Sequence, residues 1–471
     1  MTRNNSISHP EFSGVIGIGR TEITPPPGIF ARSWGSSTHD VATGVHKPLY
    51  ASCVMLRGLD DDLSLYLVSL DLSFWGNKEE SEVRSQVLQR SGLLEKQLIL
   101  HLSHTHSAPP TDLQNAGKPG GSLIQPWRDK IVAGAATAID EARNSARESV
   151  MTWAYGTCKL AHNRDQAVME AEELTTVVGL NLHDEADDTL LVGRIVDAEN
   201  NVRAVLVNYA CHPVSLGGGN TEISPDYIGK MREVVEANIA GGVCIFLHGA
   251  SGDLTPRLSY ASDPAVADQN GLEIGYAVLE TLASFLPAQS SLVFDRIEQS
   301  GAPLGRWALQ PEPASKTVAT DFATVELAYY NLPSLEELDR QIEEATDRYM
   351  LVRLQRRRQL REEMGNSDRR EIRIPVWRIG DLVIVALPAE AYSEFQQSLR
   401  KAFPDLAVIV LNIANGYFSY LPPEKSYDVP GLYQVRVALF GPGCLEQVLD
   451  SAQQTISRLD GEDNAIHSKS M

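Results

Sequence analysis

The feature that most constrains the fold of this chain is a short apolar run that recurs along it and each time ends abruptly in polar residues. Unbroken apolar runs are typical of β-strands covered on both faces, whereas strands with one wet face alternate. Ligands of α/β sheets bind beyond the carboxyl ends of the strands, so the residues that end these runs are candidate functional groups. The six runs are LYLVSLD (to Asp71), LILHLSHTHS (through His106), AVLVNYACHP (through His212), VCIFLHGASGD (to Asp253), DLVIVALPAE (to Glu390) and LAVIVLNIANGYFSY (to Tyr420).

Segments between the runs have the spacing of amphipathic helices. Apolar residues recur at helical intervals over Lys78–Arg90 and Trp127–Ala146, with charged residues between them. The predicted fold is therefore α/β: a layered core of mixed β-sheet flanked by helices, with the active site at the carboxyl ends of the strands.

One catalytic domain is expected over residues 14–450. The charged stretch near 334–365 predicts a helical excursion from it, because Ser334 can cap a helix whose first turn is acidic. The sequence EIRIPVWRIGDLVIVALP after it predicts a hairpin that turns at Gly380-Asp381. Residues 457–471 are expected to form a polar, frayed tail.

Charge and composition exclude several classes of protein. The chain has 61 acidic and 41 basic residues and a net charge of −20, which repels nucleic acid and anionic membranes. Its five cysteines include no close-spaced pair that could hold a metal, and this fits a reducing compartment. The chain shows neither a secretory signal nor an apolar run of ~20 residues, so we expect a cytoplasmic protein without a transmembrane segment.

The most informative short segment is Ser103-His104-Thr105-His106-Ser107. Two histidines separated by one residue at a strand end project to the same side and can meet one ligand. Imidazole is the commonest protein ligand for zinc, so His104 and His106 are candidates for metal binding or catalysis. His101 lies on the opposite face of the same strand and is expected to be a core histidine.

Two further segments extend this candidate metal set. His212 follows a buried strand directly and is held by Pro213, which fixes the next backbone angle. Glu390 occupies an equivalent position after the run DLVIVALP. Two histidines and one glutamate form a known catalytic zinc set that leaves one position for water.

A glycine-rich turn over His248–Pro256 could approach a ligand closely with its backbone. It is not a phosphate loop, because the Gly-Lys-Ser/Thr ending is missing. It is not a Gly-x-Ser-x-Gly elbow either, so Ser251 as a nucleophile is a minor alternative.

Six motifs in order resemble the catalytic domain of the neutral/alkaline non-lysosomal ceramidases, zinc amidases that cleave the N-acyl bond of ceramide. The opening Gly-x-Gly-x-x-Asp-x-Thr signature of that family is similar to Gly17–Thr24 here. The others are His-Thr-His-Ser (Ser103–Ser107 here), Phe-Ala-x-His-Pro (Asn208–Pro213), Gly-Asp-Val-Ser-Pro-Asn (Gly252–Arg257), Leu-Pro-Gly-Glu (Leu387–Glu390) and Asn-x-Tyr-x-x-Tyr (Asn415–Tyr420).

The resemblance implies one zinc per chain, held by His104, His212, Glu390 and Tyr420. It also implies that His106 and Arg164 line the position of the scissile amide. Thr255 stands where the family has a serine and joins the candidate catalytic residues, while Arg257 replaces the asparagine. The family's C-terminal immunoglobulin-like domain is not expected, because few residues follow Phe440.

The expected reaction is attack by a zinc-activated water on an N-acyl amide, as in sphingolipid metabolism. His106 would deliver a proton to the leaving amine, and Asp71 and Asp253 would orient the ligand histidines. The substrate is either lipid-like, which a wide apolar groove beside the zinc would favour, or a small polar amide or ester. A metal-containing binding protein without turnover is the alternative from another class.

Overall fold

The core of the protein is a curved, mixed sheet of eight strands. The computed structural model describes residues 6–59, 61–330, 332–365 and 367–467. Strand pairs β5–β6 and β12–β14 are parallel, and the other neighbours in this sheet are antiparallel. In order across the sheet the strands are β14 (Val243–His248), β12 (Val202–Tyr209), β11 (Thr189–Asp197), β7 (Arg147–Thr157), β2 (Glu11–Glu22), β4 (Tyr50–Arg57), β5 (Ser64–Leu70) and β6 (Leu98–Leu102).

A second sheet packs face to face on the first. Its middle pair forms the predicted hairpin, which turns at Gly380 with φ +57°, and β20 and β22 are parallel. Between the two sheets lies an apolar layer that includes Trp153 of the first sheet and Trp377 of the second. In order across this sheet the strands are β18 (Val318–Ala328), β19 (Arg369–Ile379), β20 (Leu382–Ala386) and β22 (Ala407–Leu411).

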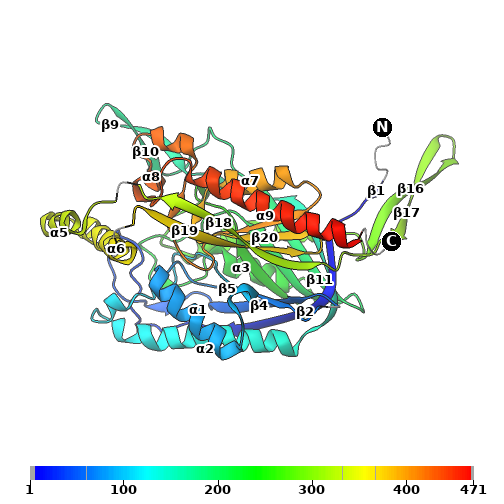
Figure 1. Cartoon of the computed structure of the whole chain (residues 1–471), viewed down its shortest axis with the longest axis horizontal. Helices are drawn as coiled ribbons and strands as arrows, with labels where there is room; N and C mark the ends of the chain where they lie inside the picture. Colours follow the sequence, from blue (N-terminus) through cyan, green and yellow to red (C-terminus); the bar gives the residue numbers. More distant parts are fainter. Residues whose placement is uncertain (1–5, 60, 331, 366, 468–471) are drawn as a thin grey trace.

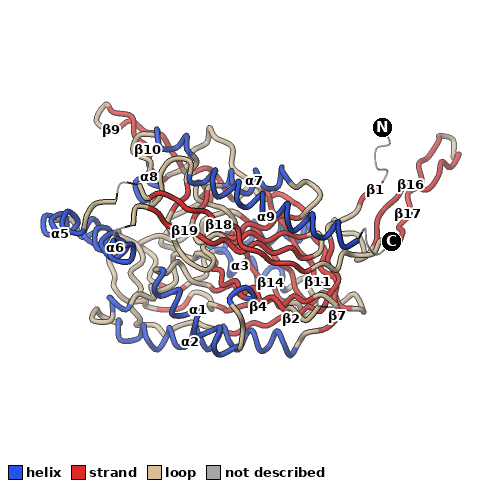
Figure 2. The backbone as a smooth tube through the Cα atoms, viewed as in Figure 1, coloured by secondary structure: helices blue, strands red, loops and turns tan. Residues whose placement is uncertain are grey.

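Helices cover the two outer faces, so the molecule has four layers (Figures 1 and 2). Helices α1 to α4 pack on the eight-stranded sheet, and α7 and α9 pack on the smaller one. This enclosure explains why the six apolar runs do not alternate: each strand has an apolar layer on both faces. The helices are α1 (Asn77–Ser91), α2 (Ile124–Asn144), α3 (Tyr227–Glu236), α4 (Pro264–Ala283), α7 (Ser393–Ala402) and α9 (Cys444–His467).

The two edge strands of the large sheet, β6 and β14, come into contact because the sheet curls on itself. Side chains join the strands here: the backbone N–H of His248 donates to His101 Nε2 of β6 at 3.0 Å, and Ser69 Oγ of the neighbouring β5 donates to the carbonyl of Phe246 at 2.9 Å. His101 is fully buried and is thus a core histidine, as predicted. The curl brings the ends of β6, β12 and β14 to one place.

Several elements extend from the four layers (Figure 1). Helices α5 (Leu335–Glu344) and α6 (Arg348–Met364) lie where the sequence predicts a helical excursion, and Ser334 caps α5 by accepting from the N–H of Glu337. Further strands are β1 (Ser6–Ile7) with β16 (Ser290–Gln299) and β17 (Pro303–Pro311), β9 (Asp165–Glu170) with β10 (Glu173–Val178), and β3 (Gly44–Val45) with β13 (Glu222–Ile223). The remaining short helices are α8 (Tyr433–Val437), η1 (Glu95–Gln97), η2 (Leu113–Asn115), η3 (Gly121–Leu123) and η4 (Glu424–Asp428).

The expected frayed tail from Ser457 is corrected in part. Helix α9 continues through Ser457 to His467, because Ile456 and Leu459 are buried against the smaller sheet and anchor this turn. Residues 468–471 of the expected tail lie outside the described residues. Among the described residues, no helix combines the length and apolar character needed to cross a membrane.

Candidate metal centre

Four side chains predicted from the strand ends meet in the interior. His104 lies two residues beyond β6, and His212 lies three residues beyond β12. Glu390 begins the short strand β21 (Glu390–Ala391), which pairs in parallel with β23 (Tyr420–Leu421), so Glu390 stands opposite Tyr420. All four are at least 95% buried. Two imidazoles, a carboxylate and a phenol are therefore buried together at one point.

The donor atoms of these residues converge with those of His106. One ligand nitrogen from each of His104, His106 and His212 lies within 4.8 Å of the others, and the Nε2 atoms of His104 and His106 are 3.3 Å apart. Glu390 Oε2 is 2.9 Å from His212 Nε2 and 3.3 Å from His104 Nε2. Residues 104 and 106 reach the centre through a turn rather than along a strand, since His104 has φ +67°.

The Nδ1 atoms of His104 and His212 already form hydrogen bonds with the protein backbone. His104 Nδ1 lies 2.8 Å from the carbonyl oxygen of Ser73, and His212 Nδ1 lies 2.7 Å from that of Ser251. A carbonyl only accepts hydrogen bonds, so each Nδ1 carries a proton, and in the neutral form of either ring the Nε2 lone pair points toward Glu390. Burial, together with nearby Arg164, lowers the pKa of His212 to about 3 and so disfavours a second proton.

Lone pairs that face a carboxylate repel one another unless a cation lies between them. Tyr417 donates to Glu390 Oε1 at 2.7 Å and leaves Oε2 to face the histidines. Imidazole nitrogens fixed through their other nitrogen, beside a carboxylate, are a donor set that fits a divalent metal.

Arg164 and Tyr420 form a linked pair beside this cluster. Arg164 follows β8 (Ala161–Asn163), and its Nε and Nη2 donate to the carbonyl of Gly252 at 3.0 and 2.7 Å. Nη2 also donates to the Tyr420 hydroxyl at 3.0 Å, and that oxygen lies 3.4 Å from His212 Nε2. A buried guanidinium thus supports the phenol that faces the candidate metal ligands.

Thr255 lies in a short strand after the glycine-rich turn. It lies on β15 (Leu254–Pro256) opposite His162 of β8, and its buried Oγ1 has no hydrogen-bond partner. Among the described residues, no hydrogen bond joins its hydroxyl to His104, His106 or His212. A catalytic role for Thr255 stays a prediction.

The expectation that Asp71 and Asp253 orient the ligand histidines is wrong. Asp71 accepts two hydrogen bonds from Arg232 of α3, and Asp253 accepts from the backbone and hydroxyl of Ser393. Backbone carbonyls hold the histidines instead. Sequence patterns do not reveal this, because every residue carries a carbonyl and only the fold decides which one a ring meets.

His248 was not assigned a role from the sequence, yet it lies in this region. Its ring centroid is 5.3 Å from that of His104, and its Nε2 is 2.9 Å from Ser251 Oγ, which also contacts His212 Nδ1 at 3.0 Å. The signal was available, since His248 ends the apolar run VCIFLH. These contacts hold the Ser251 hydroxyl between the rings of His248 and His212.

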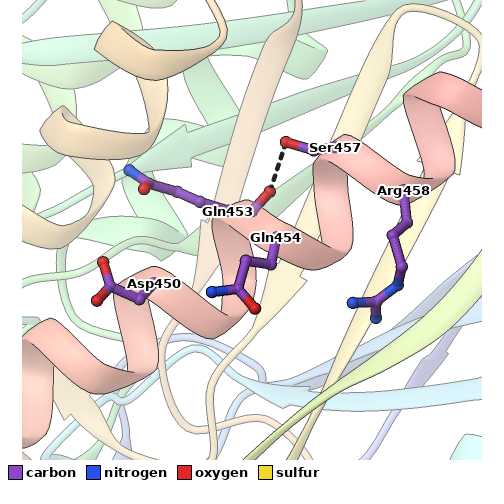
Figure 3. A pocket seen from close by; sticks show the side chains of 5 residues that line it. All are labelled: Asp450, Gln453, Gln454, Ser457 and Arg458. Atoms are coloured by element: carbon purple, nitrogen blue, oxygen red, sulfur yellow. Dashed lines mark hydrogen bonds between the residues drawn. The ribbon is translucent and has the colours of Figure 1, made fainter.

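A small cavity of about 10 Å³, the room of one water molecule, adjoins the cluster at His106. Hydroxyl, amide, imidazole and carboxylate side chains form most of its wall, and Trp34 is the one large apolar side chain there. A second, shallow hollow lies on the solvent-facing side of α9, between Asp450 and Arg458 (Figure 3). Its Ser457 hydroxyl bonds within the helix to the carbonyl of Gln453, and it is lined by none of the candidate ligands. The cavity at His106 is thus the one next to the candidate metal ligands.

The four layers and the buried histidine–glutamate cluster define a mixed α/β protein with a candidate metal centre. The family model of the neutral/alkaline non-lysosomal ceramidase N-terminal domain matches residues 15–270, more than half of the chain. The chain therefore belongs to the neutral/alkaline non-lysosomal ceramidase family, which confirms the resemblance seen in the six motifs.

Relatives and solved structures agree with this assignment. The chain is 24% identical to a neutral ceramidase of Drosophila pseudoobscura pseudoobscura over 241 residues, 47% of this chain and 32% of that protein. It thus spans about a third of the length of this curated relative. Two structures share the fold with a TM-score of 0.65 and cover 96% of this chain: a ceramidase complexed with C2 (18% identity, 76% of that chain) and the neutral ceramidase from Pseudomonas aeruginosa (19%, 75%).

Proposed function

We propose that this protein is a zinc-dependent hydrolase that cleaves an N-acyl amide bond. His104, His212 and Glu390 would hold the zinc, with Tyr420 as the fourth protein ligand. The observation that carries the proposal is the convergence of two Nε2 lone pairs on Glu390 Oε2, with both Nδ1 protons committed to carbonyls. Zinc in such a set acidifies water and so supplies the nucleophile near neutral pH.

The residues around this centre would stabilise the developing charge and transfer the proton. Arg164 fixes the position of the Tyr420 hydroxyl through their 3.0 Å contact, and this pair can stabilise negative charge that develops on the amide oxygen. His106 lies between the cluster and the cavity, where its ring can pass a proton to the leaving amine. Burial of the ligands excludes water other than the reacting one and strengthens each of these interactions.

Membership of the ceramidase family supports an amide as the bond that is broken. The name of the Drosophila relative describes that protein, and the match covers about a third of it, so the activity of this chain is inferred from its own site together with the family. Bound zinc with no turnover of any amide or ester would instead favour the alternative class, a metal-containing binding protein.

The test is hydrolysis of a short N-acetyl amide, followed by the amine released, on wild type, His212→Ala and Tyr420→Phe. We expect His212→Ala to abolish activity and Tyr420→Phe to lower kcat about 10²–10³-fold, because it removes one donor from the reacting centre. Tyr427→Phe is the matched control, since the Tyr427 hydroxyl bonds to the carbonyl of Phe440 in another part of the molecule. A zinc-loaded wild type that releases no amine would refute the proposal.

A further inference from the structure

The hairpin of β16 and β17 extends from the four layers, and the short strand β1 pairs with its base (Figure 1). We call these three strands the arm. A hairpin that extends into water has no apolar layer to cover it, so apolar side chains exposed on it require an explanation. Several such side chains lie on the arm, and the pairing of its strands shows how they are arranged.

The strand pairing sorts the side chains of the arm into an apolar and a charged face. Residues directly opposite in an antiparallel pair lie on the same face, and Phe294 stands opposite Trp307 and Ile297 opposite Gly305. A β-bulge at Asp295 adds one residue to β16 and so keeps Phe294 and Ile297 on one face. The apolar face carries Ile7, Leu292, Phe294, Ile297, Trp307 and Leu309.

This apolar face is open to solvent. The rings of Phe294 and Trp307 pack edge-on with their centroids 5.9 Å apart, which joins the two strands into one continuous patch. A large apolar side chain has an area on the order of 200 Å², so five of them, each roughly half exposed, form a patch on the order of 500 Å². Patches of this size on soluble proteins mark interaction sites. The five are Ile7, Phe294, Ile297, Trp307 and Leu309, which are between 38% and 63% exposed.

The opposite face of the hairpin carries charges that balance one another. Arg306 Nε lies 2.6 Å from Glu298 Oε2, and Arg296 forms an ion pair with Asp295. Residues 290–311 contain these two acidic and these two basic residues, so their net charge is zero, whereas the whole chain has a net charge of −20. The arm is thus a neutral segment of a strongly acidic protein.

This neutrality restricts what the arm can bind. It gives no attraction to an anionic membrane or a polyanion, which the rest of the chain repels. Two copies of the chain also repel each other over most of their surface, but they can meet through neutral arms that hold their acidic bodies apart. The charges therefore favour a second copy over a charged partner.

The position of the arm disfavours a lipid surface as its partner. The elements beside the candidate metal centre are β9, which begins one residue after Arg164, and α8, whose Tyr433 packs edge-on against Tyr420 at 5.9 Å. Figure 1 shows β9, β10 and α8 at the end of the molecule opposite to the arm. An arm docked on a lipid surface would hold the candidate metal centre away from that surface.

Two identical apolar faces can cover each other. A two-fold axis brings the same patch of each copy together, and two sheets then pack about 10 Å apart, as in a β-sandwich. The patch supplies somewhat more than half of the ~800 Å² per partner of a standard interface, so the expected dimer is of moderate, micromolar affinity.

We propose that the apolar face of the arm is a dimerisation surface, on which two copies of this chain pack face to face about a two-fold axis. Phe294 and Trp307, which lie in the middle of this face, make the central contact. The inference does not depend on the proposed hydrolytic function, because the arm contains none of the candidate metal ligands.

Sedimentation velocity on the full chain tests the proposal over a series of concentrations. We expect wild type to sediment as a monomer at about 0.1 μM and as a dimer at about 100 μM. Trp307→Lys and Leu309→Lys each place a charge on the apolar face and should raise the dissociation constant of the dimer about 30-fold or more. If one of these variants does not fold, which circular dichroism shows, the other carries the test.

Leu304→Lys is the matched control. Leu304 is also exposed on β17, but it stands opposite Glu298 and so lies on the charged face of the same hairpin. All three variants change the net charge of the chain by the same amount. Leu304→Lys should leave the dissociation constant within about 3-fold of the wild-type value, because it lies outside the contact.

Salt distinguishes an apolar contact from one made by ion pairs. Raising sodium chloride from about 0.05 to about 0.5 M screens the repulsion between two acidic copies, so the dimer should become tighter or stay unchanged. A dimer that weakens about 10-fold or more over this range is held by charges and would overturn the proposal.

Three other results would also overturn it. The first is a wild type that stays monomeric at every concentration, and the second is a dimer that survives both Trp307→Lys and Leu309→Lys. The third is a monomer that co-sediments with phosphatidylcholine vesicles and loses this binding in Trp307→Lys, which would assign the apolar face to a lipid surface instead.

Discussion

At the scale of single residues, the candidate metal centre depends on what holds each ligand from behind. The carbonyls of Ser73 and Ser251 fix the rings of His104 and His212, and the Tyr417 hydroxyl fixes the carboxylate of Glu390. Such outer contacts choose the tautomer of a ring and the direction of its lone pair. The ligand geometry is therefore set by three polar contacts that do not themselves touch a metal.

Replacing Tyr417 with phenylalanine tests this support. Tyr417→Phe removes the 2.7 Å hydrogen bond to Glu390 Oε1 and leaves the ring in place. We expect zinc affinity to fall about 10- to 100-fold, the usual effect of removing a contact behind a ligand. Competition with a chromophoric chelator measures this affinity. An unchanged affinity in Tyr417→Phe, equal to that of the Tyr427→Phe control, would contradict the role given to Tyr417.

The residues that meet at the centre could be predicted from the sequence, but their supports could not. His104, His106, His212, Glu390 and Tyr420 all follow apolar runs, and the ends of these runs meet although the first three residues follow strands of the large sheet and the last two follow strands of the smaller one. The partners of Asp71 and Asp253 were misjudged because the pairing of Asp71 with Arg232 depends on how α3 packs, over a separation of 161 residues. Side-chain partners across such distances follow from packing and leave no local pattern.

At the scale of elements, the Gly17-Ile18-Gly19 segment of β2 is explained by the helix that crosses it. A Cβ atom at Gly17 would lie 1.8 Å from the carbonyl oxygen of Ala142, and one at Gly19 would lie 2.0 Å from that of Ala138. Both oxygens belong to α2, so the helix backbone leaves no room for a side chain at either glycine. The opening motif of the family is thus a packing requirement.

Substitution of Gly19 with alanine should therefore destabilise the protein. Because the clash is with helix backbone rather than with a flexible side chain, α2 must move, and we expect a loss of about 1–3 kcal/mol in the free energy of unfolding. Guanidinium unfolding monitored by tryptophan fluorescence measures it. Gly117→Ala is the matched control, since nothing lies within 4 Å of a Cβ there. Equal stabilities for the two variants would show that α2 is not so closely packed.

Element types followed from local patterns, whereas their arrangement did not. The six apolar runs all contain strands, and Lys78–Arg90 and Trp127–Ala146 coincide closely with α1 and α2. The order of strands in the eight-stranded sheet, and the existence of a second sheet facing it, depend on pairings between segments far apart in the sequence. Periodicity shows that a strand is covered on both faces but not by which layer.

At the scale of the whole molecule, the site exists because the large sheet curls until β6 and β14 touch. His101 joins these edges by accepting from the backbone N–H of His248. Burial lowers the pKa of His101 to about 3, from an ordinary value of 6.5. The contact that closes the sheet is thus made by a histidine that stays neutral in the folded protein.

This histidine should make the stability of the protein depend on pH. Below pH 6.5 the unfolded chain binds a proton at His101 that the folded protein does not, so stability falls as the pH drops from 6.5 toward 3. Asp253, whose pKa is raised by burial to about 6, acts in the opposite direction between roughly pH 6 and 4. A comparison with a His101 variant isolates the histidine.

His101→Gln keeps an acceptor at this position and removes the titration. Between pH 7.5 and 5.5, we expect wild type to lose about 1.4 kcal/mol more unfolding free energy than His101→Gln. Urea unfolding at the two pH values gives this difference. If the variant and wild type lose the same amount, His101 does not titrate on unfolding as described.

The most direct test of the metal centre is the zinc content of the purified protein, measured by mass spectrometry on wild type, His104→Ala, His212→Ala and His106→Ala. We predict about one zinc per chain in wild type, loss of it in His104→Ala and His212→Ala, and retention in His106→Ala, because His106 is assigned to proton transfer and not to metal binding. Wild type without bound metal would contradict the metal centre itself. Loss of zinc in His106→Ala to the same extent as in His104→Ala would contradict the ligand set and make the three histidines the ligands instead.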